Sequence, residues 1–92
     1  MAKQRLHLMI FGEVQGVFFR AHVREKAKEH SLVGWAKNKP DNTVEVVAEG
    51  EKDNLELFLK ACWKGPPAAE VADIKAEWQK PTGEFDRFEI VY

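Results

Sequence analysis

Cysteine is nearly absent from the sequence, which holds Cys62 alone among its 92 residues. A disulfide within the chain is therefore excluded, and so is a metal site built from several thiolates. The first residues are basic and then apolar, but Glu13 interrupts the apolar run and no small-residue cleavage site follows. We therefore expect no secretory leader and a reducing location, the cytoplasm.

Long apolar runs and an excess of one charge are also missing. No stretch approaches the roughly 18 to 20 apolar residues that span a membrane. The 14 Lys and Arg residues nearly balance the 15 Asp and Glu residues, which leaves a net charge of -1. Such a chain has no overall field that attracts nucleic acid or anionic lipid, so any anion site must be local. We expect neither a nucleic-acid partner nor a membrane partner.

Apolar residues are plentiful, at 45% of the sequence, and they include six Phe and three Trp. This supply is enough for one hydrophobic core, although a chain of this size buries a modest fraction of its surface. We expect residues 1–92 to form one domain and to act as a monomer.

The spacing of apolar residues predicts strands and helices in a regular order. Alternation predicts five strands, over residues 5–11, 32–38, 43–49, 72–78 and 88–92. A helical spacing of four predicts a first helix over about residues 20–30, with Phe19, Val23 and Ala27 on its apolar face. Between the second and third strands, Lys39-Pro40-Asp41-Asn42 predicts a tight turn, because Pro40 suits its first central position and Asn42 tolerates a left-handed backbone.

A second helix has the clearest apolar pattern, with Leu55, Phe58, Leu59 and Cys62 at i, i+3, i+4 and i+7. Asp53, followed by Glu56 three residues later, predicts a capping box at its start. Gly65 and the two prolines after it predict its end.

This element order is βαββαβ with a short C-terminal strand added. It predicts an α+β fold, a ferredoxin-like sandwich in which two helices cover one face of an antiparallel sheet. Proteins with this fold include RNA-binding and ligand-binding domains, so function must be argued from a site.

The loop between the first strand and the first helix, GEVQGVFFR at residues 12–20, is the candidate site. A loop that leads into a helix N-terminus presents unpaired N–H groups and the positive end of the helix dipole. Glycines let such a loop turn its amides inward around an anion such as phosphate, and Arg20 adds a planar fork that holds two oxygens. Glycine-bearing loops of this kind also occur in domains that bind nothing, and that alternative stays open from spacing alone.

Two longer motifs extend this observation. The first is Gly12-x-Val14-Gln15-Gly16-Val17-x-Phe19-Arg20, and the second is Gly34-Trp35-Ala36-Lys37-Asn38, followed by Val44 and Gly50. With Gly65-Pro66-Pro67-x-Ala69 and the final FEIVY, the sequence resembles the acylphosphatase family over nearly its whole length.

The resemblance implies a small hydrolase that needs neither metal nor cofactor and cleaves acyl phosphates to a carboxylate and inorganic phosphate. It implies that Arg20 binds the phosphate, that Asn38 orients the attacking water, and that the phosphate-cradling loop comprises Glu13, Val14, Gln15, Gly16, Val17, Phe18 and Phe19. A non-catalytic module that senses phosphate through the same loop is the alternative. Without the resemblance, Asn38 is more simply explained as a turn cap.

Asn42 departs from the family pattern, which usually has glycine at this point of the hairpin. We expect a stability cost of about 0.5 to 1 kcal/mol relative to glycine, with activity retained. His7, His22 and His30 lack the helical i, i+4 spacing of a zinc site, so no metal ligands are assigned.

Overall fold

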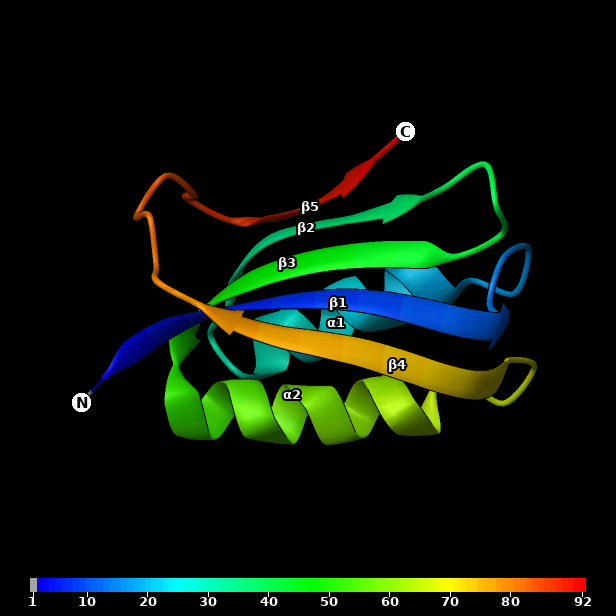
Figure 1. The fold of residues 1–92 in the computed structure, drawn as a ribbon, viewed down its shortest axis with the longest axis horizontal. Helices are drawn as coiled ribbons and strands as arrows, with labels where there is room; N and C mark the ends of the chain where they lie inside the picture. Colours follow the sequence, from blue (N-terminus) through cyan, green and yellow to red (C-terminus); the bar gives the residue numbers. More distant parts are fainter. Residues whose placement is uncertain (1) are drawn as a thin grey trace.

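The computed structural model describes residues 2–92. Its elements follow the predicted order along the chain (Figure 1). They are β1 (Lys3–Glu13), α1 (Phe19–Glu29), β2 (Val33–Asn38), β3 (Val44–Glu51), α2 (Lys52–Lys64), β4 (Glu70–Gln79) and β5 (Phe88–Val91).

The strands form one sheet in the order β4-β1-β3-β2-β5. The pairs β1–β3, β1–β4 and β2–β3 are antiparallel, as predicted, but β5 runs parallel to β2. The sheet is therefore mixed, and the prediction of a wholly antiparallel sheet is wrong for its last strand. The physical reason is the connection after β4, residues 80–87, which crosses the end of the sheet and enters β5 in the direction of β2 (Figure 1).

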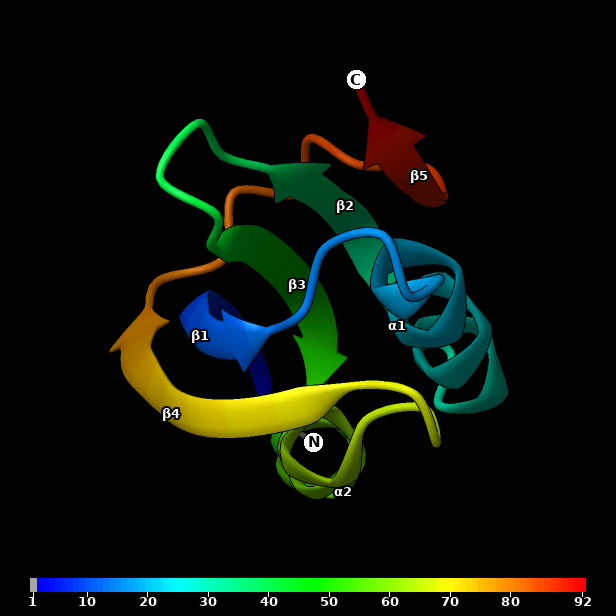
Figure 2. The ribbon, with the colours of Figure 1, turned by 90° about the vertical axis from the view of Figure 1, so that its right-hand side faces the viewer.

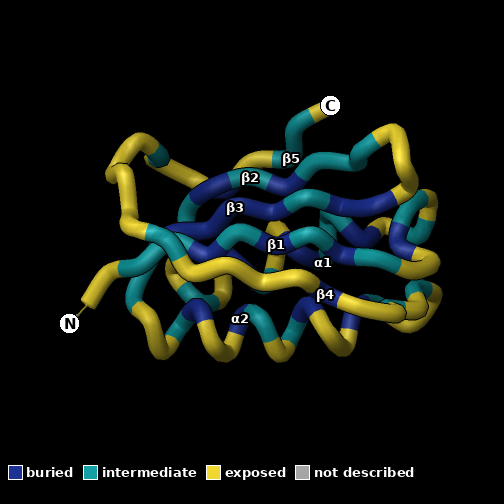
Figure 3. Tube along the Cα trace, viewed as in Figure 1, coloured by how far each residue is buried: buried dark blue, intermediate teal, exposed yellow. Residues whose placement is uncertain are grey.

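Both helices cover the same face of the sheet, as predicted (Figure 2). Each helix buries one stripe of side chains: Phe19, Val23 and Ala27 in α1, and Leu55, Phe58 and Cys62 in α2. These stripes pack against alternate residues of the central strands, including Leu6, Leu8, Ile10, Val44, Val46 and Ala48, which are all fully buried. Burial is accordingly concentrated in β1, β3 and β2, while β4 at the sheet edge is mostly exposed (Figure 3).

The start of α2 differs from the prediction. The helix begins at Lys52, its N-cap is Glu51, and no side chain in the described part of the chain caps it. Asp53 lies inside the first turn, where its charge still suits the helix dipole, but it forms no capping box. The reason is that β3 runs into α2 without a loop, so the last strand residue takes the cap position and the Lys52 N–H donates to the Ala2 carbonyl at 3.1 Å.

The β2–β3 hairpin forms as predicted. The Asn42 N–H donates to the Lys39 carbonyl at 3.1 Å, and the Lys39 N–H donates to the Thr43 carbonyl at 2.9 Å. Asn42 has φ 71°, which confirms its left-handed conformation. A three-residue hairpin loop commonly ends in a left-handed residue of this kind.

Within residues 2–92, no helix has the length and apolar character that crossing a bilayer requires.

Candidate active site in the loop before the first helix

The chain leaves the sheet at the end of β1 through a bulge. The register with β4 shifts between Phe11 and Gly12, and Gly12 has φ 129°. A Cβ at Gly12 would lie 2.2 Å from the Glu70 carbonyl oxygen, so only glycine allows the two strands to approach this closely. Val14 then packs into the core, 1% exposed, and anchors the loop that follows.

The loop backbone is left-handed at two alternate residues, Gly16 with φ 73° and Phe18 with φ 59°. A chain that alternates left-handed residues with others turns successive N–H groups toward one concave side, which is the geometry of an anion-binding nest. Phe18 is also the N-cap of α1, and among the described residues no side-chain hydrogen bond caps that helix. The main-chain donors expected at this position are therefore free of side-chain acceptors.

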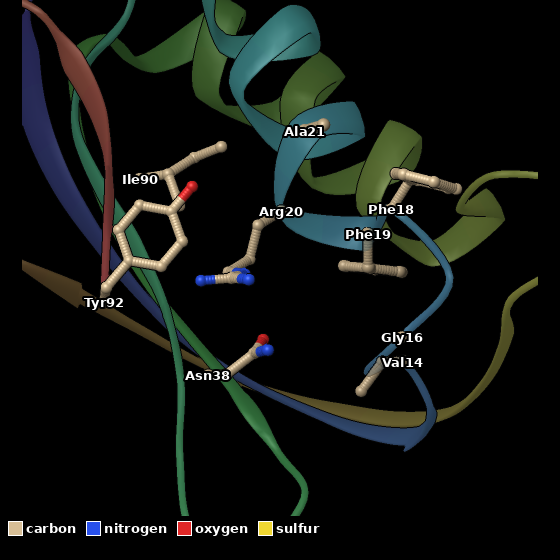
Figure 4. Close-up of a pocket in the computed structure, with 9 residues that line it drawn as sticks. All are labelled: Val14, Gly16, Phe18, Phe19, Arg20, Ala21, Asn38, Ile90 and Tyr92. Carbon is tan, nitrogen blue, oxygen red and sulfur yellow. The ribbon is translucent and has the colours of Figure 1, made fainter.

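These donors border a pocket of about 350 Å³ (Figure 4). The pocket brings together the loop, the first turn of α1, the end of β2 and the last residues of the chain. Its lining comprises Val14, Gly16, Phe18, Phe19, Arg20, Ala21, Asn38, Ile90 and Tyr92. Both predicted side chains, Arg20 and Asn38, thus lie in one pocket with the glycine of the loop.

Arg20 is half-buried and is held by neutral groups. Its Nη1 donates to the Val91 carbonyl at 3.4 Å, and its Cζ lies 4.8 Å from the centroid of the Tyr92 ring. Within residues 2–92, no carboxylate lies within ion-pair distance of this guanidinium. Its positive charge therefore remains available for an anion, which makes a local positive site in a chain whose net charge is -1.

Asn38 is the last residue of β2, and its side chain points toward Arg20 (Figure 4). Its Oδ1 is buried without a hydrogen-bond partner among the described residues. A buried, unpaired amide oxygen costs about 1 to 3 kcal/mol, and such groups are often found where function requires them. The turn is instead capped by Asp41, whose Oδ1 accepts from the Thr43 N–H at 3.2 Å. The geometry therefore counts against the turn-cap explanation of Asn38.

The predicted loop residues divide into two groups. Val14, Gly16, Phe18 and Phe19 line the pocket, whereas Glu13, Gln15 and Val17 do not. Glu13 is an exposed residue of β1 opposite Glu70, and Val17 packs against the core.

Gln15 faces the hairpin instead of the pocket. Its Nε2 donates to the carbonyl of Lys39 at 2.8 Å and to the carbonyl of Thr43 at 2.9 Å. Gln15 therefore ties the loop to the hairpin that carries Asn38.

Sequence reasoning missed three lining residues, Ala21, Ile90 and Tyr92. Ala21 follows Arg20 in the first turn of α1. Ile90 and Tyr92 belong to the last segment of the chain, and their position depends on the pairing of β5 with β2. The FEIVY segment was matched to the family, but no local pattern indicated that it borders the pocket. The left-handed conformation of Phe18 was also not predicted, because the glycines alone were expected to give the loop its curvature.

Histidines do not contribute to the pocket lining. His22 lies one turn into α1, where burial is the largest influence on its imidazole and lowers its pKa. Residues 2–92 contain no group of three or more His, Cys, Asp or Glu side chains that could hold a metal ion.

Comparison with known proteins agrees with this geometry. A sequence model of the acylphosphatase family matches residues 6–90. An acylphosphatase of Pelotomaculum thermopropionicum is 45% identical over 92 residues, which is 100% of both chains. The crystal structure of an acylphosphatase from Bacillus subtilis superimposes with a TM-score of 0.94 at 37% identity, covering 97% of this chain and 99% of that one. An acylphosphatase structure from Coxiella burnetii gives 0.90 at 38% identity, covering 97% and 93%.

The family match spans most of the chain, and the relatives align over nearly their full length. The alternative of a module that senses phosphate without hydrolysis is not favoured by these likenesses. This chain belongs to the acylphosphatase family and hydrolyses the carboxyl–phosphate bond of acyl phosphates.

Proposed function

We propose that the pocket between the loop and the hairpin is the active site, with the phosphoryl group held by the loop amides and Arg20 and the attacking water oriented by Asn38. The observation that carries this proposal is the guanidinium of Arg20, which lies beside a left-handed loop and has no carboxylate partner among the described residues.

Phosphate binding requires donors that are already in place. Main-chain N–H groups at Gly16 and Phe18 and at the first turn of α1 are fixed by the backbone, so they need no reorganisation as charge shifts in the transition state. The guanidinium of Arg20 adds two parallel donors and a full positive charge. Together these groups stabilise a dianion without lysine.

Hydrolysis requires one bond to form and one to break. The water oxygen forms a bond to phosphorus, while the bond between phosphorus and the carboxyl oxygen breaks and its electrons leave with the carboxylate. Phosphoryl transfer has a loose transition state, and a carboxylate is a good leaving group, so positioning can replace a strong base. The Asn38 amide is neutral and places the water, and a phosphoryl oxygen accepts its proton.

The experiment is hydrolysis of benzoyl phosphate by the wild type, Arg20→Gln and Asn38→Ala. We expect Arg20→Gln to lower kcat/KM at least about a thousandfold and to weaken inhibition by inorganic phosphate. We expect Asn38→Ala to keep phosphate inhibition while kcat falls by about a hundred- to a thousandfold. Arg24→Gln, on the exposed side of the same helix, is the matched control and should retain activity.

Circular dichroism of each variant checks that it is folded. Phosphate binding without hydrolysis by the wild type would favour a sensor instead of an enzyme. Loss of phosphate inhibition in Asn38→Ala would contradict the assignment of Asn38 to water. The proposed steps use only groups of this chain, so EDTA should leave hydrolysis unchanged.

We also propose that residues 1–92 act as one domain, because one hydrophobic core includes buried residues from both helices and all five strands, and that this domain acts as a monomer. The cytoplasm is the proposed location, since Cys62 is a free and buried thiol. Specific activity that stays constant on dilution would support the monomer.

A further inference from the structure

The pocket has an aromatic wall that belongs to neither the loop nor the hairpin. Tyr92 and Ile90, two residues apart at the end of the chain, line it together. They lie on the side of Arg20 and Asn38 that is opposite Gly16 and Val14 (Figure 4). The loop donors and the aromatic wall therefore border different parts of the pocket.

Tyr92 contributes little to the core, because 92% of its surface is exposed. One ring contact is with Arg20, whose Cζ lies 4.8 Å from the ring centroid. A ring that is exposed to this extent keeps most of its surface free for another contact. Ile90 beside it lies in β5, is partly buried and adds an apolar side chain to this wall.

The volume of the pocket leaves room beside the phosphoryl group. A cavity needs about 10 to 15 Å³ to hold one water-sized group, so four phosphate oxygens take up roughly 40 to 60 Å³. The pocket holds about 350 Å³. The acyl group is joined to the phosphate through one oxygen, so it must lie next to the phosphate site.

Resting on the proposed function, we propose that Tyr92 and Ile90 form an acyl-group subsite that favours acyl phosphates with a flat aromatic acyl group over those with an acetyl group. A substrate ring can pack against the free surface of Tyr92 and against the apolar side chain of Ile90. Aromatic pairs gain more than their buried area alone provides, and an acetyl group is too small to make such a contact.

The test compares two substrates in three proteins. We measure kcat/KM for benzoyl phosphate and for acetyl phosphate with the wild type, Tyr92→Ala and Tyr92→Phe. The ratio of the two values is compared between proteins, because the different chemical reactivity of the substrates then cancels. We expect Tyr92→Ala to lower the benzoyl-to-acetyl ratio about five- to tenfold, mainly through KM for benzoyl phosphate. Tyr92→Phe keeps the ring and should keep the ratio within about twofold.

A role of Tyr92 that is limited to holding Arg20 gives a different result. In that case Tyr92→Ala lowers kcat/KM for both substrates by the same factor and weakens phosphate inhibition, and this outcome would overturn the subsite. If the wild type hydrolyses neither substrate, the proposed function itself fails and the subsite fails with it. Since the side chain is exposed, Tyr92→Ala should fold, and circular dichroism confirms this before the ratio is interpreted.

Discussion

At the scale of single residues, Asn42 carries backbone strain in the turn of the hairpin that also holds Asn38. Its φ of 71° is a conformation in which asparagine is better tolerated than most residues but worse than glycine. The side chain is exposed, so no lost packing complicates its replacement.

We therefore expect Asn42→Gly to raise the free energy of unfolding by about 0.5 to 1 kcal/mol, because glycine adopts this conformation without strain. Asn42→Ala should lower it by about 1 kcal/mol, since a Cβ without a local hydrogen-bonding group is disfavoured there. Urea unfolding followed by tryptophan fluorescence measures both changes. Benzoyl phosphate hydrolysis should stay within about twofold for Asn42→Gly. A glycine variant less stable than the wild type would contradict the strain argument.

Phe18 is a second strained residue, and it lies in the site itself. Its left-handed φ of 59° is unusual for a bulky side chain, and 86% of that side chain is exposed. Packing of Phe18 therefore does not explain the conformation. The turn into α1 explains it better, since local strain is often retained at functional sites. We propose that this geometry directs the loop amides into the pocket.

At the scale of elements, the loop and the hairpin form one unit through Gln15. Its amide donates to two carbonyls that flank the turn, those of Lys39 and Thr43. The loop and Arg20 belong to one continuous segment, whereas Asn38 belongs to the hairpin. We therefore propose that Gln15 sets the distance between the proposed phosphate donors of the loop and Asn38, the residue proposed to place the water.

Removal of this tie should affect turnover more than phosphate affinity. We expect Gln15→Ala to lower kcat for benzoyl phosphate by about tenfold to a hundredfold, the scale of a small misplacement of reacting groups. The inhibition constant for inorganic phosphate should change by less than about threefold. Gln15→Glu should be worse than Gln15→Ala, because a carboxylate cannot donate to the two carbonyls. Equal losses of kcat and phosphate affinity would instead show that Gln15 shapes the loop itself.

Elements with strong local patterns could be predicted from the sequence, and those fixed by distant contacts could not. Nearby residues determine the apolar stripes of α1 and α2 and the turn at Lys39–Asn42. They also place Arg20 directly after a loop that contains glycines. The start of α2 was misplaced, because Asp53 and Glu56 have capping-box spacing but β3 continues directly into the helix. Tyr92 was missed because its place depends on how β5 pairs, which no nearby residue determines.

At the scale of the whole molecule, the connection that leads into the last strand lies at the end of the sheet opposite the loop between β1 and α1 (Figure 1). The buried carboxylate of Glu49 on β3 accepts hydrogen bonds from the N–H groups of Thr82 and Gly83, at 2.9 and 3.0 Å, and from Arg5 at 3.1 Å. These bonds hold the connection between β4 and β5. The strand that brings Tyr92 to Arg20 thus depends on a carboxylate at the opposite end of the fold.

The charge of Glu49 makes this anchor dependent on pH. Burial alone raises the pKa of the Glu49 carboxyl, but the donors from Thr82, Gly83 and Arg5 outweigh it, so the net pKa is lowered. A folded pKa below the unfolded value gives stability that is present above the unfolded pKa, about 4.3 for Glu, and is lost as the pH falls through the folded value.

We therefore expect Glu49→Gln to lower the free energy of unfolding by about 2 kcal/mol at pH 7, because the charge-assisted bonds are lost and Arg5 keeps only its ion pair with the exposed Glu84. Urea unfolding at pH 7, 5 and 3 measures the difference from the wild type, which should shrink at pH 3 as the wild-type carboxyl takes up its proton. Glu89→Gln removes an exposed carboxylate paired with Arg87 and should cost less than about 0.5 kcal/mol at each pH. A difference for Glu49→Gln that stays constant from pH 7 to pH 3 would assign the stabilisation to the shape of the side chain, because the ionised form gains more from the donors around it than the protonated form does.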